Sequence, residues 1–289
     1  MTDFARYEAP LRRILFELEP YLGDLVIIGG WVPYLYKRYG GFTSWNTGTT
    51  RTDEIDVLIN PPLYSDGRPT IPEILSRARF EPSGGGGGLA VWMGDIGSGE
   101  KLEFLVPHRG VARAEGNIVA VEGQPGIAAI PLWGLELLWR FKQRLRIPIT
   151  TVEGASGLEI WLPTLGAYVV SKATTYARRD ASRPEAASKR AKDLLYLRDL
   201  LAAGDDVVAR IGSDLDEIAL ASPQKVWSQH LRGARNMLRL AIDGANERIL
   251  PEVAQMLVER EPSHTLDRAL ADVKGHLTDL VDIIDDVLE

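Results

Sequence analysis

The sequence predicts an α+β protein in which a mixed-sheet lobe, residues 1–160, precedes a mainly helical lobe, residues 161–289. Two observations carry this prediction. The first half of the chain is rich in glycine, proline and short apolar runs, which are typical of strands joined by turns. The last part, about 120 residues, repeats apolar residues at helical spacing. The change between the two patterns falls near residues 150–165.

The first lobe begins with an amphipathic helix and a short buried strand. Apolar residues recur at helical spacing within residues 7–19, which predicts a helix there. The apolar run at residues 25–28 ends in Gly29 and Gly30, which indicates a strand followed by a close approach of the backbone to another group. A helix is expected to start at residue 31 and to run to residue 39. Pro33 falls in its first turn, where proline is tolerated.

The remaining elements follow from the same periodicities. Residues 42–52 are polar and rich in glycine and threonine, which predicts a loop. Apolar or alternating runs predict strands at residues 54–59, 89–93, 101–106 and 157–163, with the middle two in a hairpin. Helical spacing predicts helices at residues 72–79, 164–179, 184–203, 223–243, 251–260 and from 266 to the end.

Composition excludes several classes of protein. With 45% hydrophobic and 25% charged residues, the composition is that of an ordinary globular protein. A net charge of −7 excludes a wholly cationic nucleic-acid coat, but it allows a local basic cleft. The absence of cysteine excludes disulfides, thiolate metal sites and cysteine nucleophiles. No apolar run approaches the ~18–20 residues of a membrane span, and the start is unlike a signal peptide, so we expect a cytoplasmic protein without a membrane partner.

The strand predicted at residues 54–59 carries two acids on one face. Residues two apart on a strand point the same way, so Glu54 and Asp56 project together while Ile55 and Val57 face the core. Neighbouring carboxylates repel unless a cation lies between them, and Mg²⁺ or Mn²⁺ takes such oxygen ligands. A solvated edge strand with incidental acids is the alternative interpretation.

A third acid lies on the strand predicted at residues 101–106. Glu103 alternates there with Leu102 and Phe104, which is also the pattern of a strand with one solvent-facing side. Beside Glu54 and Asp56 it would complete a three-carboxylate set able to hold two metal ions. Such a set stabilises the attacking and leaving oxygens of an in-line phosphoryl displacement.

The order of these features resembles the nucleotidyltransferase superfamily typified by DNA polymerase β. In that superfamily a Gly-Gly or Gly-Ser pair opens a helix, a strand with an Asp-x-Asp or Glu-x-Asp pattern follows, and a third acid lies on a later strand. The matching segments are IIGGWVPYLYKRYG, RTDEIDVLI and KLEFLVP, within residues 25–107. Two positions differ: Glu54 stands where aspartate is commoner, and Trp31 follows the glycines where many members carry serine or threonine. The Gly-Gly-Trp sequence resembles a branch that includes aminoglycoside-type transferases.

This resemblance implies a nucleotidyltransferase-type sheet with an NTP in the cleft between the two lobes. Glu54 and Asp56 would bind two Mg²⁺ (or Mn²⁺) ions. Glu103 would bind the catalytic metal and help to activate the acceptor hydroxyl as a general base. Gly29 and Gly30 would let the backbone approach the triphosphate.

The first helix of the second lobe places a lysine on an apolar face. Lys172 shares that face with Val169 and Tyr176, and Asp193 on the next helix shares its face with Leu197. A lysine in such a position needs an anion. Two interpretations stay open. Lys172 and Asp193 form one structural salt bridge, or Lys172 holds nucleotide phosphate while Asp193 orients Lys172 or the acceptor.

This stretch resembles the AbiEii-like and MenT-like toxin nucleotidyltransferases of bacterial toxin–antitoxin and phage-defence systems. They carry a lysine on one helix, an arginine soon after and a Lys-Asp pair in the next helix. The matching positions are Lys172, Arg178 or Arg179, Lys192 and Asp193. The resemblance implies catalytic roles for Lys172 and Asp193, binding of the nucleotide by Lys172, an RNA acceptor such as the 3′ end of tRNA, and a cognate antitoxin protein as partner.

Basic residues gather between these two helices. From residue 172 to 192 the chain has seven basic and two acidic residues, a local charge of +5, which would attract triphosphate or RNA. A solvated helical hairpin is the alternative. The residues expected to bind RNA are Arg178, Arg179, Arg183, Lys189 and Arg190. A second basic run that could contact a phosphate backbone is Arg140, Lys142, Arg144 and Arg146.

The sequence therefore predicts a metal-dependent nucleotidyltransferase that moves an NMP from an NTP to an acceptor hydroxyl and releases pyrophosphate. An RNA acceptor and a toxin role follow from the second resemblance. Two alternatives stay open: a small-molecule, aminoglycoside-type nucleotidyltransferase, and a catalytically inactive nucleotidyltransferase fold that serves as a binding module.

Overall fold

The computed structural model describes residues 3–45, 48–50, 52–83, 88–94, 100–108, 118–151, 154–179, 184–244 and 249–289. The chain groups into two compact units. Unit 1 comprises Met1–Val32 and Arg51–Pro163, and unit 2 comprises Pro33–Thr50 and Thr164–Glu289. Unit 2 thus includes a segment from the first part of the chain. The predicted domains, residues 1–160 and 161–289, stay a prediction.

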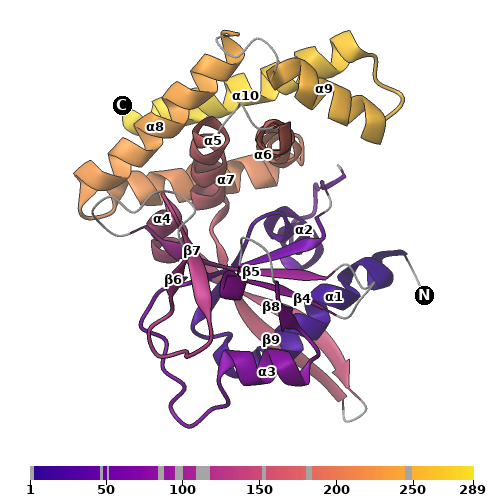
Figure 1. Cartoon of the computed structure of the whole chain (residues 1–289). Coiled ribbons are helices and arrows are strands. Elements are labelled where there is room, and N and C mark those ends of the chain that lie inside the picture. The colour runs from indigo at the N-terminus through magenta and orange to yellow at the C-terminus, as the bar shows by residue number, and fades with distance from the viewer. Residues whose placement is uncertain are drawn as a thin grey trace. The chain divides into compact units, whose positions relative to one another are not determined.

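Unit 1 is built on a mixed sheet in the order β3-β4-β5-β2-β1-β9-β8, with β7 pairing with β5 and β6 with β7 (Figure 1). The pairs β1–β9, β2–β5 and β5–β7 are parallel, and the others are antiparallel. The strands are β1 Leu25–Ile28, β2 Glu54–Ile59, β3 Glu81–Pro82, β4 Val91–Met93, β5 Lys101–Pro107, β6 Val119–Ala120, β7 Ala128–Leu132, β8 Lys142–Thr151 and β9 Gly154–Pro163.

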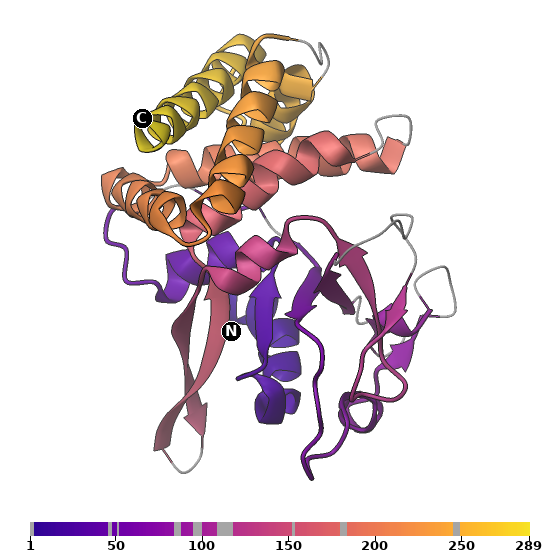
Figure 2. The same ribbon diagram turned by 90° about the vertical axis from the view of Figure 1, so that its left-hand side faces the viewer.

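The sequence of each strand reflects its place in the sheet. Strand β1 is buried along its whole length, so it is a continuous apolar run rather than an alternating one. Strand β8 forms the edge and pairs with β9 in a long hairpin (Figure 2). An edge position explains how β8 accommodates Pro148, which lacks a backbone donor.

Helices α1, α3 and α4 and two 3₁₀ turns complete unit 1. The apolar stripe predicted for the first helix is buried at Leu11, Ile14, Leu15 and Leu18. Helix α3 starts with a capping box, in which the Thr70 side chain accepts from the Glu73 N–H and the Glu73 side chain accepts from the Thr70 N–H. The elements are α1 Asp3–Glu17, η1 Glu19–Tyr21, α3 Ile71–Arg77, η2 Gly88–Ala90 and α4 Leu135–Arg140.

Unit 2 is helical throughout its described secondary structure. Helix α5 packs against α6, α7 and α8, while α10 packs against α6, α7, α8 and α9. The apolar stripe of α10 is buried at Val273, Leu277, Leu280 and Ile284. The helices are α2 Trp31–Tyr39, which begins in unit 1, and α5 Leu165–Arg178, α6 Pro184–Leu201, α7 Asp205–Leu220, α8 Gln224–Ile242, α9 Ile249–Arg260 and α10 Leu266–Leu288.

The predicted α+β class, with a mixed sheet and a helical C-terminal part, is confirmed. The hairpin of β4 and β5 is also confirmed. The α-helices and strands not predicted from the sequence are α4, α7, β3, β6, β7 and β8. Strand β8 alternates arginines with apolar residues, as a strand with one solvated face does, and α7 repeats the buried Val207, Ile211 and Leu215 at helical spacing, so a local signal for both elements is present in the sequence. Across the described residues, no helix has the length and apolar character to cross a membrane.

Candidate active site

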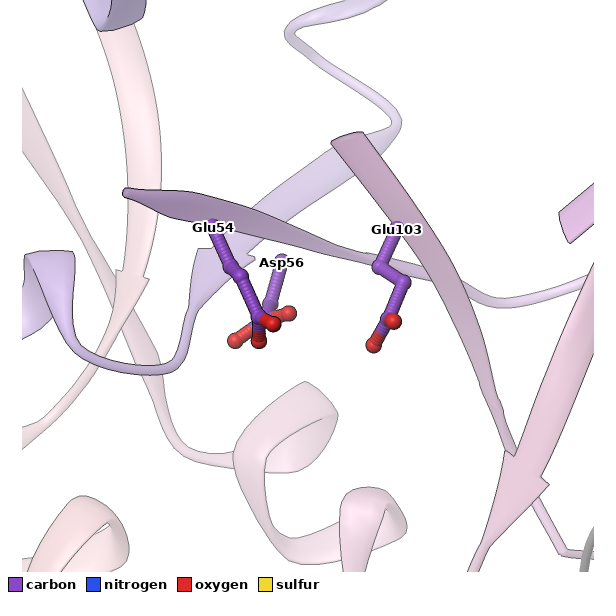
Figure 3. Close-up of side chains that lie close together, drawn as sticks. All are labelled: Glu54, Asp56 and Glu103. Atoms are coloured by element: carbon purple, nitrogen blue, oxygen red, sulfur yellow. The ribbon is translucent and has the colours of Figure 1, made fainter. Parts of the chain in front are cut away.

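Three carboxylates meet on one face of the sheet in unit 1. Glu54 and Asp56 come from β2 and Glu103 comes from β5, and one oxygen of each lies within 4.8 Å of the others. Figure 3 shows the three side chains extending toward the same side of the two strands. The structure therefore brings together the three acids that the sequence analysis selects.

The register of two parallel strands positions these acids. Asp56 pairs with Glu103, and Glu54 pairs with Lys101. Residues paired across neighbouring strands point to the same face, and the intervening Ile55 and Leu102 are fully buried on the other. The carboxylates thus project from the backbone of adjacent strands, and such placement is more rigid than placement on loops.

Gly29 lies directly against the acid cluster. It follows Ile28, which pairs with Asp56 in the antiparallel β1–β2 ladder. Its φ of +73° favours glycine, and a Cβ atom there would overlap with Oδ2 of Asp56. Helix α2 begins two residues later at Trp31, and the first N–H groups of a helix suit an anion. Binding of the nucleotide by Gly29 and by the buried Gly30 stays a prediction.

A lysine lies among the acids. The ammonium of Lys101 is 2.9 Å from Oε1 of Glu54 and 2.8 Å from Oε1 of Glu103. Burial by itself would lower the pKa of Lys101, but its hydrogen bonds to Glu103 and Glu54, and their negative charges, outweigh burial and raise the pKa above its ordinary value. Three carboxylates and one ammonium give the cluster a formal charge of −2.

No role for Lys101 is predicted from the sequence. The alternation rule that pairs Glu54 with Asp56 also places Lys101 on the face of Glu103, because the two are neighbours at i and i+2. That signal is present in the sequence. The contact of Lys101 with Glu54, however, depends on β5 lying beside β2 in the observed register, and a local sequence pattern does not determine that register.

The donor set fits a hard divalent cation. All three acids supply carboxylate oxygens, which Mg²⁺ and Mn²⁺ prefer. The residual charge of −2 matches one such ion. None of the three acids is fully buried, so an ion bound there could keep water ligands or share a substrate phosphate. Glu54, Asp56 and Glu103 are therefore the residues that would hold a metal.

A second charged cluster lies in unit 2. The ammonium of Lys172 is 2.7 Å from Oδ1 of Asp193, and Nε of Arg179 is 2.8 Å from Oδ2 of the same carboxylate. Only 3% of the Asp193 side chain is exposed, so two cations satisfy a buried acid. The Lys172–Asp193 pair is thus formed. The predicted roles of both residues toward a nucleotide stay predictions.

The predicted RNA-binding residues have different environments. Arg178, at the end of α5, and Lys189, in α6, are exposed. Arg179 bonds to Asp193, and Arg190 is buried with its Nε donating to the carbonyl of Tyr176. Arg183 lies outside the described residues. Arg178 and Lys189 are consequently the best placed of the described four to meet an external polyanion, and RNA binding stays a prediction.

Comparison with known proteins agrees with this geometry. A family model described as nucleotidyltransferase matches residues 14–208. The matched segment contains both clusters. No curated protein and no solved structure matches the chain significantly. The family match does not distinguish the AbiEii-like or MenT-like branch from other members.

Proposed function

The chain belongs to a family of nucleotidyltransferases, and from that premise we propose that it transfers an NMP from an NTP to an acceptor hydroxyl at Glu54, Asp56 and Glu103. The observation that carries the proposal is the convergence of these three carboxylates on one sheet face. Gly29, which cannot carry a side chain without displacing Asp56, supports it independently. The proposed cofactor is Mg²⁺ or Mn²⁺.

The proposed chemistry divides between the metal and the protein. A divalent metal, when bound, neutralises charge on the triphosphate and on the reacting oxygens. Glu54 and Asp56 would hold it from β2. The acceptor oxygen bonds to the α-phosphorus, the bond from that phosphorus to the β-bridging oxygen breaks, and pyrophosphate leaves. Glu103 accepts the proton of the acceptor hydroxyl as general base.

We propose RNA as the acceptor, with the 3′ end of tRNA as the first candidate, and a cytoplasmic toxin with a cognate antitoxin as the biological setting. The likeness of Lys172, of Arg178 or Arg179, and of the Lys192–Asp193 pair to toxin nucleotidyltransferases supports this proposal. The exposed Arg178 and Lys189 supply the positive charge that an RNA backbone requires.

The sheet offers a second surface for a polyanion. Across neighbouring strands, Leu58 pairs with Val26, Val26 with Trp161, and Trp161 with Arg144, so these residues share one face of the sheet. Leu58 is two residues from Asp56 on β2 and points the same way. Arg144 therefore lies on the face of the sheet that carries the three acids. Arg144 lies over the Trp161 ring at 4.9 Å. Arg144 also forms an ion pair of 3.0 Å with Glu159, so a polyanion bound there would compete with this acid.

A transfer assay tests the proposal. The full chain is incubated with each α-labelled NTP, Mg²⁺, total RNA and, separately, a panel of aminoglycosides and other small alcohols. The expected result is label in the RNA fraction from one or more NTPs, and labelling slower by about 10²–10³-fold with the Asp56→Asn variant. Label on a small molecule alone would replace RNA as the acceptor.

An inactive binding module is the second candidate function, and the position of Lys101 favours it. An ammonium already bridges two of the acids, so metal binding must compete with an internal cation. Absence of both nucleotide transfer and metal-dependent NTP binding in calorimetry would support the inactive module and contradict the enzyme.

A further inference from the structure

Lys101 has no role in the chemistry described so far, although it bonds directly to two of the three acids. Its ammonium lies between carboxylates from two strands, 2.9 Å from Glu54 and 2.8 Å from Glu103. Three quarters of its side chain is removed from solvent. These contacts are as short as charge-assisted hydrogen bonds normally are.

Backbone geometry holds Lys101 in this place. It occupies the position on β5 that pairs with Glu54 on β2, and Glu103 lies two residues further along the same strand. All three side chains consequently share one face. The Lys101 backbone is paired on both sides, with Glu54 in β2 and with Met93 in β4. A lysine anchored in the middle of a sheet can turn its ammonium away only by side-chain rotation.

We propose that Lys101 takes the place of one of the two divalent ions that a three-carboxylate site can hold, so that this site binds a single divalent ion. The inference rests on the proposed function. Two carboxylate oxygens, one each from Glu54 and Glu103, are committed to the ammonium. The net charge of −2 that remains is neutralised by one divalent ion, and a second ion would have to enter beside a fixed positive charge.

The competing arrangement is a site with two ions in which Lys101 rotates out when metal binds. The two arrangements differ in the number of ions bound and in the response to loss of the lysine charge. If Lys101 substitutes for an ion, its removal opens a second ion position. If it only rotates away, its removal leaves the number of ions unchanged.

Electron paramagnetic resonance of bound Mn²⁺ counts the ions directly. The full chain is saturated with a non-hydrolysable NTP and titrated with Mn²⁺, as wild type and as Lys101→Met. We expect one protein-dependent Mn²⁺ per wild-type chain and two per Lys101→Met chain. Without nucleotide, the first ion should bind Lys101→Met roughly tenfold or more tightly than wild type, because a neighbouring positive charge is gone.

Two further variants control the comparison. Lys101→Arg keeps the charge, so it should bind one Mn²⁺ like the wild type. Lys274→Met removes a lysine from the exposed side of α10 in unit 2, and it should leave the number of ions at one. Thermal unfolding shows that each variant is folded, and Mn²⁺ should raise the midpoint of Lys101→Met more than that of wild type.

Two ions on the wild-type chain, or equal numbers and affinities on wild type and Lys101→Met, would overturn the inference. No ion on the wild type with ions on Lys101→Met would overturn it too, because the lysine would then exclude metal altogether. Failure of the proposed function has another signature. In that case the wild type binds no NTP with any metal and labels no acceptor, whereas an active enzyme with two ions contradicts only the role of Lys101.

Discussion

In unit 1 one ammonium, that of Lys101, binds two of three clustered carboxylates, whereas in unit 2 one carboxylate, Asp193, holds both Lys172 and Arg179. The acids of the first cluster are also more exposed to solvent than Asp193. Side-chain exposure is 36% for Glu54 and 18% for Glu103, but 3% for Asp193. The first cluster has excess negative charge that solvent can reach, and the second has a buried acid surrounded by excess positive charge.

The difference teaches what each cluster can do. Partly exposed acids that outnumber their cations repel one another, and they gain from an external cation. A buried acid with two basic partners already has its charge balanced inside the protein. Loss of that acid leaves the two basic side chains without their partner where little water can solvate them. The first cluster therefore favours binding and chemistry, and the second favours stability of the α5–α6 pair.

The largest effect is expected from Asp56→Asn. Removal of one negative ligand should lower the rate of nucleotide transfer by about 10²–10³-fold, because several kcal/mol of charge stabilisation are lost. The fold should persist, and without metal the midpoint of thermal unfolding should stay level or rise, since repulsion with Glu54 and Glu103 is relieved. Label transfer and thermal unfolding measure the two quantities.

Asp53→Asn is the matched control for that change. Asp53 is an exposed acid just before β2 and lies outside the cluster, so its amide variant should transfer label at the wild-type rate. An Asp56→Asn variant that is as active as Asp53→Asn would mean that other acids carry the chemistry.

The corresponding variant in unit 2 is Asp193→Asn, which should destabilise the protein. Loss of this acid leaves Lys172 and Arg179 without their shared partner, and we expect the free energy of unfolding to fall by about 2–3 kcal/mol. Urea unfolding monitored by circular dichroism measures it. Asp216→Asn, an exposed acid on α7, should change the free energy little. Equal stability of both variants would show that Asp193 is not held as a structural partner.

Comparison of alanine variants at Gly29 and Gly134 tests how the backbone supports the acids. Gly29 and Gly134 both have positive φ, but only Gly29 lies against Asp56, while nothing lies near a Cβ at Gly134. Gly134→Ala should lower the free energy of unfolding by about 1 kcal/mol through backbone strain alone. Gly29→Ala should add displacement of Asp56 and weaken Mn²⁺ binding by about tenfold. Equal Mn²⁺ affinities in calorimetry would show that Gly29 does not support the metal site.

The smallest effect concerns the acceptor. Reversal of Arg178 and Lys189 to glutamate should weaken RNA binding and flatten its salt dependence by about 0.7–0.9 log unit for each phosphate that the protein no longer neutralises. NTP binding should be unchanged. Filter binding across a salt series measures the slope. If reversal of Arg144 and Arg146 flattens the slope instead, the acceptor binds the sheet of unit 1 rather than the α5–α6 turn.

The sequence by itself determined the α+β class and the local placement of the three acids. Strand alternation puts Glu54 and Asp56 on one face because successive side chains point to opposite sides of a strand. Helical spacing likewise places Lys172 and Asp193 on the apolar, packed faces of α5 and α6. These results need only local geometry, which each short segment carries in its own pattern.

Only the tertiary structure decided which strands lie side by side and in which register. Parallel pairing of β2 with β5 brings Glu103 opposite Asp56 and inserts Lys101 opposite Glu54. The two strands are about 40 residues apart in the chain, so no local periodicity encodes their register, which depends on how the buried faces pack together. For the same reason the burial of Arg190 and the second partner of Asp193 emerge only from the packing of α5 against α6.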